Sequence, residues 1–580
     1  MHGSVWSSRS PARYGVCAAA ACVLLAGQPG QAADDGRITT AALMPVRPEA
    51  TGELQGGATA VLPTPDQLEA RRAMIGSVAI SVDEIFDEAD PREDGLLYRL
   101  ANDLKIHTRE GTIREALLLR PGDTFSVQKA EESARLLRER NYLADAEVVP
   151  ARYDAQTNTV DMNVRVRDVW TLEPGIGIGR SGGTNKTRLR VADENLFGFG
   201  QKLALGYSSD VDRSGVNLQF IDPNLFHSWW SLNTAYAGNS DGSNAFIDIG
   251  RPFFSLDSRW SASFSGNSRS EITPLYTLGE KVSEFESQYD NVSVQGGISR
   301  GLVDGWTTRW LAGYRYDRAR FTPVPGGEFA TVDIPDDRTL SYPWVGIELI
   351  EDRFATTHNR DQIGRTEDIF LGRRFHASVG FASPALGSDR SAGIFSLGGG
   401  TSYTVGELGE MDLTANWEGR VESGGLADAV AELSTRYYHR FDERNTLMAF
   451  VGAAHADELT EDRQLQLGGD NGLRGYPLRY QTGDTRLQAT VEQRHYTDWY
   501  PFRLFRVGAA AFADVGRMWG GDPAVTGPQE WLADVGVGLR LGNARSGSGG
   551  SVLHIDIAFP LNGAQDIDSM QLLLEGRKSF

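Results

Sequence analysis

Residues 177–183 contain two short patterns that are typical of enzyme active sites and nucleotide-binding sites. Gly179-Arg180-Ser181-Gly182-Gly183 fits the Gly-x-Ser-x-Gly pattern of a serine nucleophile, and an overlapping run fits the Gly-x-Gly-x-x-Gly pattern of a dinucleotide-binding turn. Both patterns require a strand that leads at once into a helix. Here the glycines lead into another alternating strand, so we interpret the segment as a β-hairpin turn.

The histidines do not form a metal-binding pattern. Those that follow residue 33 are His107, His227, His358, His376, His439, His455, His495 and His554. They lack the His-x-x-x-His spacing that places two ligands on one helix face. A serine–histidine pair built across strands stays open, because sequence does not show which strands face each other. The charged runs at residues 351–353 and 359–361 indicate solvated loops. We therefore expect no metal, no cofactor and no enzymatic activity.

The charge balance argues against a nucleic-acid-binding protein. Lys and Arg number 57 whereas Asp and Glu number 77, which gives a formal net charge of −20. Such a surface repels phosphate backbones, and no basic run offsets it. The length of 580 residues exceeds one ordinary domain, so we expect two or more folding units.

Residues 1–32 have the features of a secretory signal peptide. Arginines precede an apolar run that is too short to span a bilayer, and we expect cleavage after Ala32. Both cysteines, Cys17 and Cys22, lie in this segment, so the mature chain is expected to have no disulfide and no thiolate metal site. Lipidation of Cys22 is the alternative, although it leaves a very short apolar core.

The next segments predict a linker and a small domain. Residues 33–75 are rich in Pro, Gly, Ala and Thr and predict a flexible linker. Residues 76–169 mix strand and helix patterns and predict an α+β domain. Strands are expected at residues 77–82, 146–149 and 159–167, and helices at residues 96–104, 113–119 and 126–140.

Residues 170–580 lose helical periodicity and show short alternating runs between turn clusters. No run after the signal peptide approaches the ~20 apolar residues of a membrane-spanning helix. That leaves a soluble periplasmic protein or a transmembrane barrel, whose alternating strands keep hydropathy low. At about 9–11 residues per strand, the length suits about 16 strands. The predicted fold class is mainly β: a transmembrane antiparallel β-barrel preceded by one small α+β domain.

An ordered set of short motifs follows in the second half of the chain. They are a Leu473-Arg474-Gly475-Tyr476 loop, the strand residues Phe512, Asp514 and Gly516, and the terminal Phe580. This set resembles the outer-membrane β-barrel assembly and translocation superfamily, the bacterial surface antigens that include BamA, TamA and the two-partner secretion transporters. The α+β domain resembles a single POTRA domain. The resemblance covers residues 76–580.

The resemblance implies that the loop with Arg474 folds back into the barrel lumen. A cation in that confined space is costly unless it is paired. We expect Glu492 and Asp514 to receive it, because arginine can contact a carboxylate with two parallel hydrogen bonds. The alternative is that residues 470–472 form a simple hairpin turn and that Arg474 is a solvated surface charge.

Glycines mark both sides of the expected closure seam. Gly175, Gly177 and Gly179 lie on one face of the first barrel strand, and Gly576 lies in the last strand, which ends at Phe580. Glycine weakens strand packing, so we expect this seam to pair weakly and to open sideways. Its exposed edges would then template an incoming strand. The alternative is that the glycines only relieve curvature in a closed barrel.

The resemblance implies an outer-membrane protein, with its POTRA domain in the periplasm, that inserts or translocates polypeptides. The expected partners are unfolded or nascent polypeptides, outer-membrane lipids and accessory periplasmic proteins, with residues 160–166 as the strand edge offered to a client. A single POTRA domain favours an accessory or specialised role. Lys578 lies where an apolar residue is common in the superfamily, so we expect weaker recognition of this chain by the host assembly machinery. The alternatives are a two-partner-secretion-type export pore, a passive porin-like channel and an outer-membrane hydrolase.

Overall fold

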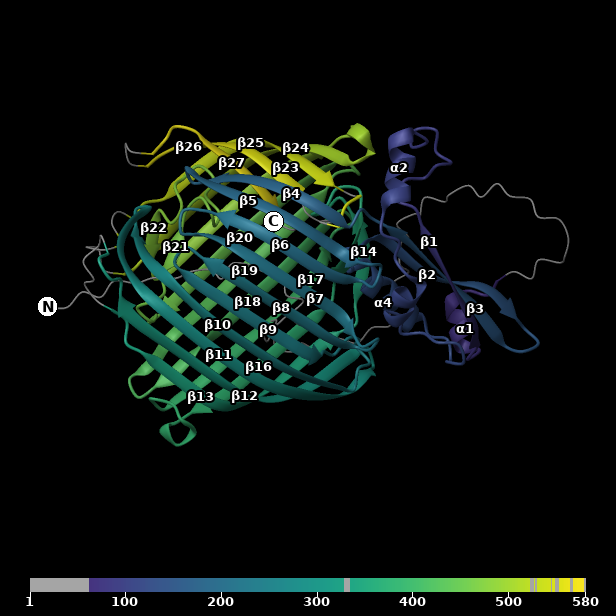
Figure 1. Cartoon of the computed structure of the whole chain (residues 1–580), viewed down its shortest axis with the longest axis horizontal. Helices are drawn as coiled ribbons and strands as arrows, with labels where there is room; N and C mark the ends of the chain where they lie inside the picture. Colours follow the sequence, from purple (N-terminus) through teal and green to yellow (C-terminus); the bar gives the residue numbers. More distant parts are fainter. Residues whose placement is uncertain are drawn as a thin grey trace.

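The computed structural model describes residues 62–327, 334–521, 526, 529–543, 545–547, 552–563 and 567–577. A small α+β module precedes a closed β-barrel and lies against one end of it (Figure 1). We call this end the module end and the opposite end the far end. The predicted signal peptide and the terminal Phe580 lie outside the described residues.

The folded module begins inside the predicted linker. Helix α1 (Pro65–Ala70) starts after Thr64, whose side chain accepts a hydrogen bond from the N–H of Gln67 at 3.3 Å. This capping box, with Pro65 at the first helical position, is a local start signal that composition alone hides. Leu68 is fully buried in the module core. The predicted domain start at residue 76 is therefore too late.

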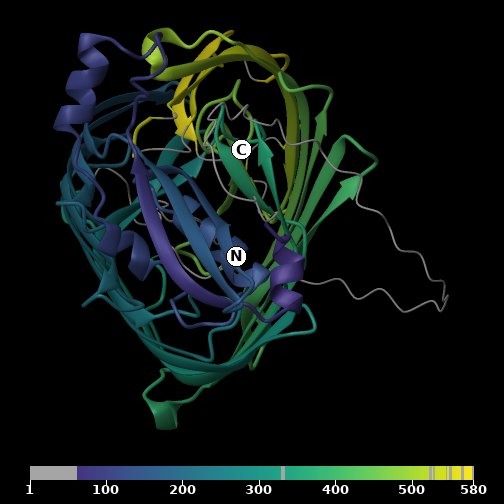
Figure 2. The ribbon, with the colours of Figure 1, turned by 90° about the vertical axis from the view of Figure 1, so that its right-hand side faces the viewer.

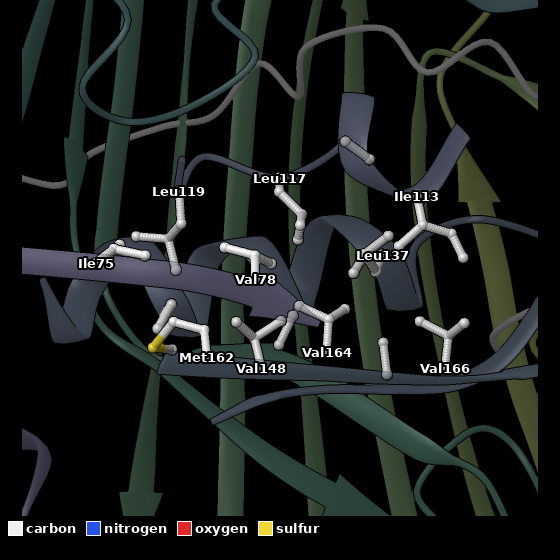
Figure 3. Close-up of a cluster of buried hydrophobic side chains, with 14 of the residues drawn as sticks. Ile75, Val78, Ile113, Leu117, Leu119, Leu137, Val148, Met162, Val164 and Val166 are labelled. Carbon is white, nitrogen blue, oxygen red and sulfur yellow. The ribbon is translucent and has the colours of Figure 1, made fainter. Parts of the chain in front are cut away.

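Within residues 62–169, a three-stranded sheet packs against helices. The further elements are β1 (Met74–Asp83), α2 (Leu96–Leu104), α3 (Glu110–Glu115), α4 (Val127–Arg138), β2 (Leu143–Asp154) and β3 (Thr159–Asp168). The sheet order is β1-β3-β2, with β1 parallel and β2 antiparallel to β3. Apolar side chains of the sheet and of α3 and α4 form one core (Figure 3).

Two expectations for the module are wrong. β3 is the central strand, so residues 160–166 pair on both sides and cannot offer a free edge. The alternation of β3 predicted a strand, but strand order depends on long-range pairing that alternation does not encode. The edge strands are β1 and β2. The helix expected at residues 113–119 ends at Glu115, and Leu117 and Leu119 are buried beyond it.

Among the described residues, twenty antiparallel strands close the barrel. They are β4 (Leu172–Ser181), β5 (Thr184–Leu196), β6 (Gln201–Ser209), β7 (Ser214–Leu225), β8 (Trp230–Asn239), β9 (Gly242–Arg251), β10 (Trp260–Thr277), β11 (Glu280–Val303), β12 (Trp306–Pro323), β13 (Arg338–Glu351), β16 (Arg373–Ala382), β17 (Ala392–Val405), β18 (Gly409–Glu422), β19 (Gly425–Arg440), β20 (Asn445–Asp457), β23 (Thr485–Tyr496), β24 (Phe505–Trp519), β25 (Leu532–Asn543), β26 (Val552–Pro560) and β27 (Gln571–Arg577). Short 3-10 turns, η1 (Pro384–Leu386) and η2 (Pro501–Arg503), lie between strands.

The predicted fold class is confirmed, but the prediction of about 16 strands is too low. Several hairpins turn in only two residues, which is shorter than the loops that a count of about 16 strands assumes. Gly182 and Gly183, with φ of +52° and +79°, join β4 to β5. Leu278 and Gly279 join β10 to β11. The residues saved in such turns build additional strands. No helix in the described part of the chain is long and apolar enough to cross a membrane.

Side chains of the barrel strands alternate between the outer surface and the lumen. In β25, Val535, Val537 and Leu539 are exposed, whereas Asp534 and Arg540 are buried. The apolar side faces outward and the charged side faces inward, which is the reverse of a water-soluble protein. This pattern is typical of a barrel that faces lipid and has a polar interior.

Two elements enter the lumen from opposite ends. The hairpin of β14 (Phe354–His358) and β15 (Thr366–Phe370) joins β13 to β16 at the module end, and Figure 2 places it inside the barrel outline. The strands β21 (Leu465–Leu467) and β22 (Gln481–Gly483) leave the far end and carry the predicted loop between them. We call these elements the lumen hairpin (residues 352–372) and the arginine loop (residues 468–480).

Candidate functional site

The arginine loop folds tightly against the inner wall of the barrel. Leu473 and Tyr476 are fully buried. The hydroxyl of Tyr476 donates to the carbonyl of Ala533 at 2.9 Å. A Cβ atom on Gly475 would lie 2.6 Å from the Cβ of Asp534, so only glycine allows the backbone to approach this wall. The loop thus delivers its arginine to the strands of the last third of the chain.

Arg474 contacts both carboxylates that we nominated. Its Nε and Nη2 lie 2.7 and 3.0 Å from the two carboxylate oxygens of Asp514. Its Nη1 lies 2.7 Å from Oε2 of Glu492. The guanidinium carbon lies 3.3 Å from the ring centre of Phe512. These charged side chains are at most 3% exposed, so water screens their attraction only weakly.

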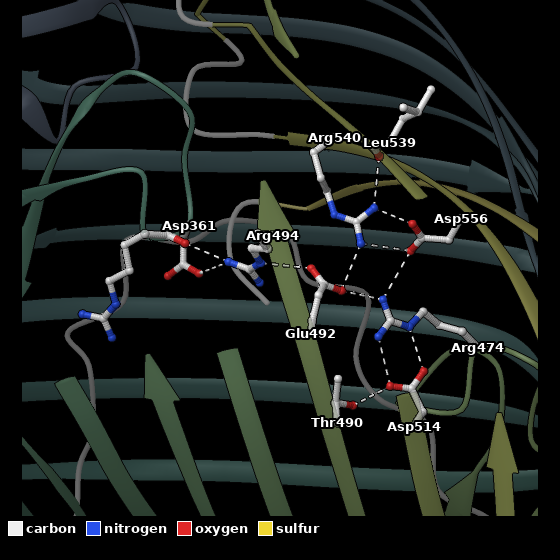
Figure 4. A network of polar contacts seen from close by, with 10 residues as sticks. Asp361, Arg474, Thr490, Glu492, Arg494, Asp514, Leu539, Arg540 and Asp556 are labelled. Carbon is white, nitrogen blue, oxygen red and sulfur yellow. Dashed lines mark hydrogen bonds and ion pairs between the residues drawn. The ribbon is translucent and has the colours of Figure 1, made fainter. Parts of the chain in front are cut away.

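Further charged side chains extend this pair into a network. Arg494 Nε lies 2.9 Å from Oε1 of Glu492, and Arg540 Nη2 lies 3.0 Å from Oε2 of the same residue. Arg540 also pairs with Asp556, which lies 3.4 Å from Nη1 of Arg474. Guanidinium and carboxylate groups therefore alternate along the inner wall (Figure 4). The positive and negative charges of these side chains therefore balance, and the site binds one loop of its own chain.

Sequence reasoning missed Arg494, Arg540 and Asp556. The signal that was present is a charged residue between apolar neighbours in an alternating strand, as in Leu539-Arg540-Leu541. In a lipid-facing barrel such a residue must point into the lumen. Of the other predicted motif residues, Gly516 lies against β21, the strand that leads into the arginine loop, because a Cβ there would be 3.0 Å from Cδ2 of Leu467.

The turn between β4 and β5 also contacts the arginine loop. Ser181 Oγ donates to the carbonyl of Gly469 at 2.8 Å. A Cβ on Gly182 would lie 2.3 Å from the backbone nitrogen of Leu478, and Gly182 has positive φ. The Gly-x-Ser-x-Gly pattern is thus a hairpin turn, and its serine binds the loop.

The closure seam has little strand pairing. Between described residues, β27 and β4 share one register pair, Leu574 with Arg180, whereas β26 and β27 share seven. Gly175, Gly177 and Gly179 lie in β4 and Gly576 lies in β27. A Cβ on Gly179 would lie 3.1 Å from the carbonyl oxygen of Leu574. Glycine therefore allows close backbone approach beside the register pair that the described residues form.

The lumen hairpin is bonded to the module. Arg138 of α4 contacts both carboxylate oxygens of Asp368, at 2.8 and 2.5 Å. Arg365 Nη2 donates to the carbonyl of Leu143 at 2.7 Å. The guanidinium carbon of Arg135 lies 3.5 Å from the ring centre of Phe354. The module and the hairpin therefore form one connected surface at this end of the barrel.

The same hairpin is bonded to the barrel wall. Arg360 pairs with Asp412 of β18, and Tyr438 of β19 donates to Asp361 at 2.7 Å. Arg494 donates to the carbonyl of Arg360 at 2.7 Å. The interpretation of residues 359–361 as a solvated loop is therefore wrong. Because Arg494 also contacts Glu492, the hairpin and the arginine loop meet in one polar network.

A cavity of about 540 Å³ lies between the module, the lumen hairpin and strands β16–β19. Its lining is dominated by charge: Arg138, Arg140, Arg360, Arg365, Arg374, Arg436, Glu139, Asp361, Glu367, Asp368 and Asp412. Small-molecule sites are mostly apolar with a few polar groups. This lining is instead typical of a hydrated vestibule.

Charge reversal at Arg138 tests whether the module holds the hairpin. Arg138→Glu would replace a bidentate attraction with repulsion of Asp368 and should release the hairpin. A charge-assisted hydrogen bond contributes about 1.5–3 kcal/mol, so trypsin cleavage within the hairpin should accelerate about tenfold or more. The double variant Arg138→Glu with Asp368→Arg restores the attraction and should restore protection. Equal cleavage in all three proteins would contradict this role.

The raised pKa of Glu367 predicts that docking of the lumen hairpin depends on pH. Burial, and then the charge of Asp361, raise the pKa of Glu367 to about 7 from an ordinary value of 4.5. The docked hairpin therefore favours the protonated acid, so docking takes up a proton and weakens as pH rises from 4.5 through 7. Single-channel conductance should be lower at pH 5.5 than at pH 8. Glu367→Gln should remove this difference, and an unchanged pH dependence in that variant would refute the assignment.

Two family models match the chain. The POTRA model, described as the surface antigen variable number repeat, matches residues 104–168. The Omp85 superfamily domain model matches residues 420–572, which contain the arginine loop and its carboxylates. The chain belongs to the Omp85 superfamily. The resemblance inferred from the sequence motifs is thereby confirmed, with the module as its single POTRA domain.

Solved structures show only distant likeness. BamA from Haemophilus ducreyi lacking POTRA domains 1-3 is 12% identical over 87% of this chain and 84% of that chain, with a TM-score of 0.38. CdiB from Acinetobacter baumannii is 12% identical over 87% and 74%, with a TM-score of 0.43. No curated protein matches the sequence.

Membership of this superfamily gives the barrel its orientation. The barrel lies in the outer membrane with the POTRA domain in the periplasm, so the module end faces the periplasm and the far end faces outward. At the level of the superfamily, such proteins insert or translocate polypeptides and are not typical enzymes. No group of three or more His, Cys, Asp or Glu side chains suited to a metal ion occurs among the described residues.

Proposed function

We propose that this protein is an accessory insertase that passes client β-strands sideways through its closure seam into the outer membrane. The observation that carries the proposal is that, among the residues that the structure describes, β27 and β4 share one register pair. An edge strand with unused backbone groups pairs readily with another strand. Within the described part of the barrel, opening the seam therefore breaks fewer strand contacts than opening the neighbouring β26–β27 pair, which has seven register pairs.

The arginine loop is the proposed latch of this seam. Its backbone accepts the hydrogen bond from Ser181 at the tip of β4, and Arg474 ties it to β23 and β24 on the opposite side of the seam. While the loop is docked, it holds both sides of the seam together from within the lumen. Its release would leave the pair of Leu574 with Arg180 as the strand contact between the described parts of β27 and β4.

Clients would first meet the edges of the POTRA sheet. The edge strands β1 and β2 replace residues 160–166 in this role, since β3 is paired on both sides. Part of β2 is occupied, because Arg365 of the lumen hairpin donates to the carbonyl of Leu143. Displacement of that contact by a client strand would couple client binding to release of the hairpin.

A two-partner-secretion-type export pore is the second candidate. It is favoured by the lumen hairpin and the arginine loop, which could leave the lumen to open a path, and by the charged cavity at the periplasmic end. In that case the client would follow the lumen axis and the seam would stay closed.

Depletion of the protein tests both functions. Loss of specific barrels from the outer-membrane proteome would support the insertase. Loss of one secreted polypeptide with an unchanged outer-membrane proteome would support the export pore. If neither proteome changes, and if ion flux through the purified protein is insensitive to Arg474→Ala, a passive channel is the better description.

A further inference from the structure

Helix α2 presents its leucines to the outside of the molecule. Leu96, Leu97, Leu100 and Leu104 are 75%, 77%, 47% and 64% exposed. With about 3.6 residues per turn they share one face of the helix. On the opposite face, Asn102 is buried. A helix on a water-soluble surface has the reverse arrangement.

The buried polar side chain of α2, Asn102, forms hydrogen bonds with the backbone of the preceding segment. Asn102 Nδ2 donates to the carbonyl of Phe86 at 3.0 Å, and the N–H of Phe86 donates to Asn102 Oδ1 at 3.1 Å. The ring of Tyr98 lies 4.7 Å from that of Phe86. These contacts fix the rotation of the helix, so the leucines cannot turn inward.

The segment that precedes α2 is tied to the periplasmic rim of the barrel. Glu93 accepts a hydrogen bond from Arg545 at 2.8 Å, next to the β25–β26 connection. Asp90 and Glu93 also lie 3.8 and 3.9 Å from Arg503 in η2, between β23 and β24. The N–H of Trp170, just before β4, donates to the carbonyl of Arg545 at 2.8 Å. The helix is therefore anchored next to the strands that flank the closure seam.

The rim at this point is already apolar. Trp499, Phe502 and Phe505, in and beside the same β23–β24 turn, are 66%, 75% and 40% exposed. Aromatic side chains at strand ends are typical of the membrane interface. Figures 1 and 2 place α2 at the perimeter of the barrel, where it runs across the barrel axis rather than along it. Its axis thus lies roughly in the plane of the membrane.

We propose that α2 is an interfacial membrane helix that buries its four leucines in the periplasmic leaflet of the outer membrane beside the seam. An amphipathic helix of this kind lies in the interface with its apolar face among acyl chains. The match to the POTRA family model begins at residue 104, the last residue of α2, so the rest of the helix precedes the part of the chain that this model covers. The proposal depends on the membrane location of the barrel and is independent of the client.

Fluorescence quenching by lipids tests this placement. Leu97→Cys and Leu100→Cys, in full-length protein with Cys17 and Cys22 replaced by serine, are labelled with an environment-sensitive fluorophore. The protein is reconstituted in phosphatidylcholine vesicles that carry spin labels near the headgroup. Arg99→Cys tests the other side of the same helix, and Gln156→Cys tests the exposed β2–β3 turn. Leu97 is 77% exposed, so its replacement removes little packing, and circular dichroism confirms that the barrel is folded.

The expected result is a blue-shifted emission and a strong loss of fluorescence at residues 97 and 100, with little loss at residues 99 and 156. Equal quenching at all four sites, or none at residues 97 and 100, would overturn the proposal. A photo-crosslinker at residue 97 that joins to an added unfolded barrel client, without quenching in client-free vesicles, would also overturn it and identify the face as a client site.

Discussion

Replacement of Arg474 by alanine is expected to abolish client insertion while the barrel still reaches the outer membrane. The change removes the guanidinium that pairs with Asp514 and leaves Glu492 and Asp556 to Arg494 and Arg540, so the buried network gains uncompensated negative charge. Removal of one partner from a buried ion pair costs about 3–5 kcal/mol. That energy is enough to undock the arginine loop, whereas the strands keep their backbone hydrogen bonds. The measurement is the outer-membrane proteome of a depleted strain that carries the variant.

Matched variants separate the latch from general effects of charge. Asp514→Arg should fail in the same way as Arg474→Ala, because it destroys the same pair from the opposite side. Arg474→Lys keeps the charge but loses the bidentate contact, so it should be intermediate. Arg444→Ala removes a pair with Asp498 whose side chains are 56% and 77% exposed, and should be silent. Normal insertion in both Arg474→Ala and Asp514→Arg would remove the latch from the mechanism.

A disulfide across the seam is expected to stop insertion reversibly. Arg180 and Leu574 face each other in register, so cysteines at both positions can bridge β4 and β27. The only native cysteines, Cys17 and Cys22, lie in the predicted signal peptide. Oxidised protein should lose client insertion almost completely, and a reducing agent should restore it. The measurement is the rate at which a radiolabelled barrel client becomes protease-resistant.

The control pair is Leu205→Cys with Leu218→Cys, which face each other in the well-paired β6–β7 hairpin. Oxidation of this pair should have no effect, because that hairpin stays closed in either mechanism. If the oxidised seam variant still secretes or inserts its client at the normal rate, the lumen must be the route and the export pore becomes the better description.

Local sequence patterns predicted the individual helices and turns of this protein better than they predicted how the elements are arranged. Helix α2 lies where its apolar spacing predicted it, and the turn at Gly182 follows from its glycines. The contact between Arg474 and Asp514 was expected only through resemblance to a family, since the residues lie on different elements and no spacing relates them. The same limit explains the error at β3, whose neighbours are chosen by long-range pairing.

The lumen hairpin shows why charge in a sequence is ambiguous. Arg360 and Asp361 looked like solvated loop residues, yet their partners Asp412, Tyr438 and Arg494 lie on three different barrel strands. A mixed-charge run has the same composition whether water or a polar lumen surrounds it. The exposed leucines of α2 show the same ambiguity for an apolar pattern. Helical periodicity identifies an apolar face but does not show whether protein, lipid or water surrounds it.

The decisive measurement is the folding rate of a urea-unfolded outer-membrane barrel in vesicles that contain the purified protein. We predict that the client becomes protease-resistant markedly faster than in protein-free vesicles, and that Arg474→Ala or the oxidised seam disulfide removes the acceleration. A client that folds at the same rate with and without the protein would contradict insertion through the seam.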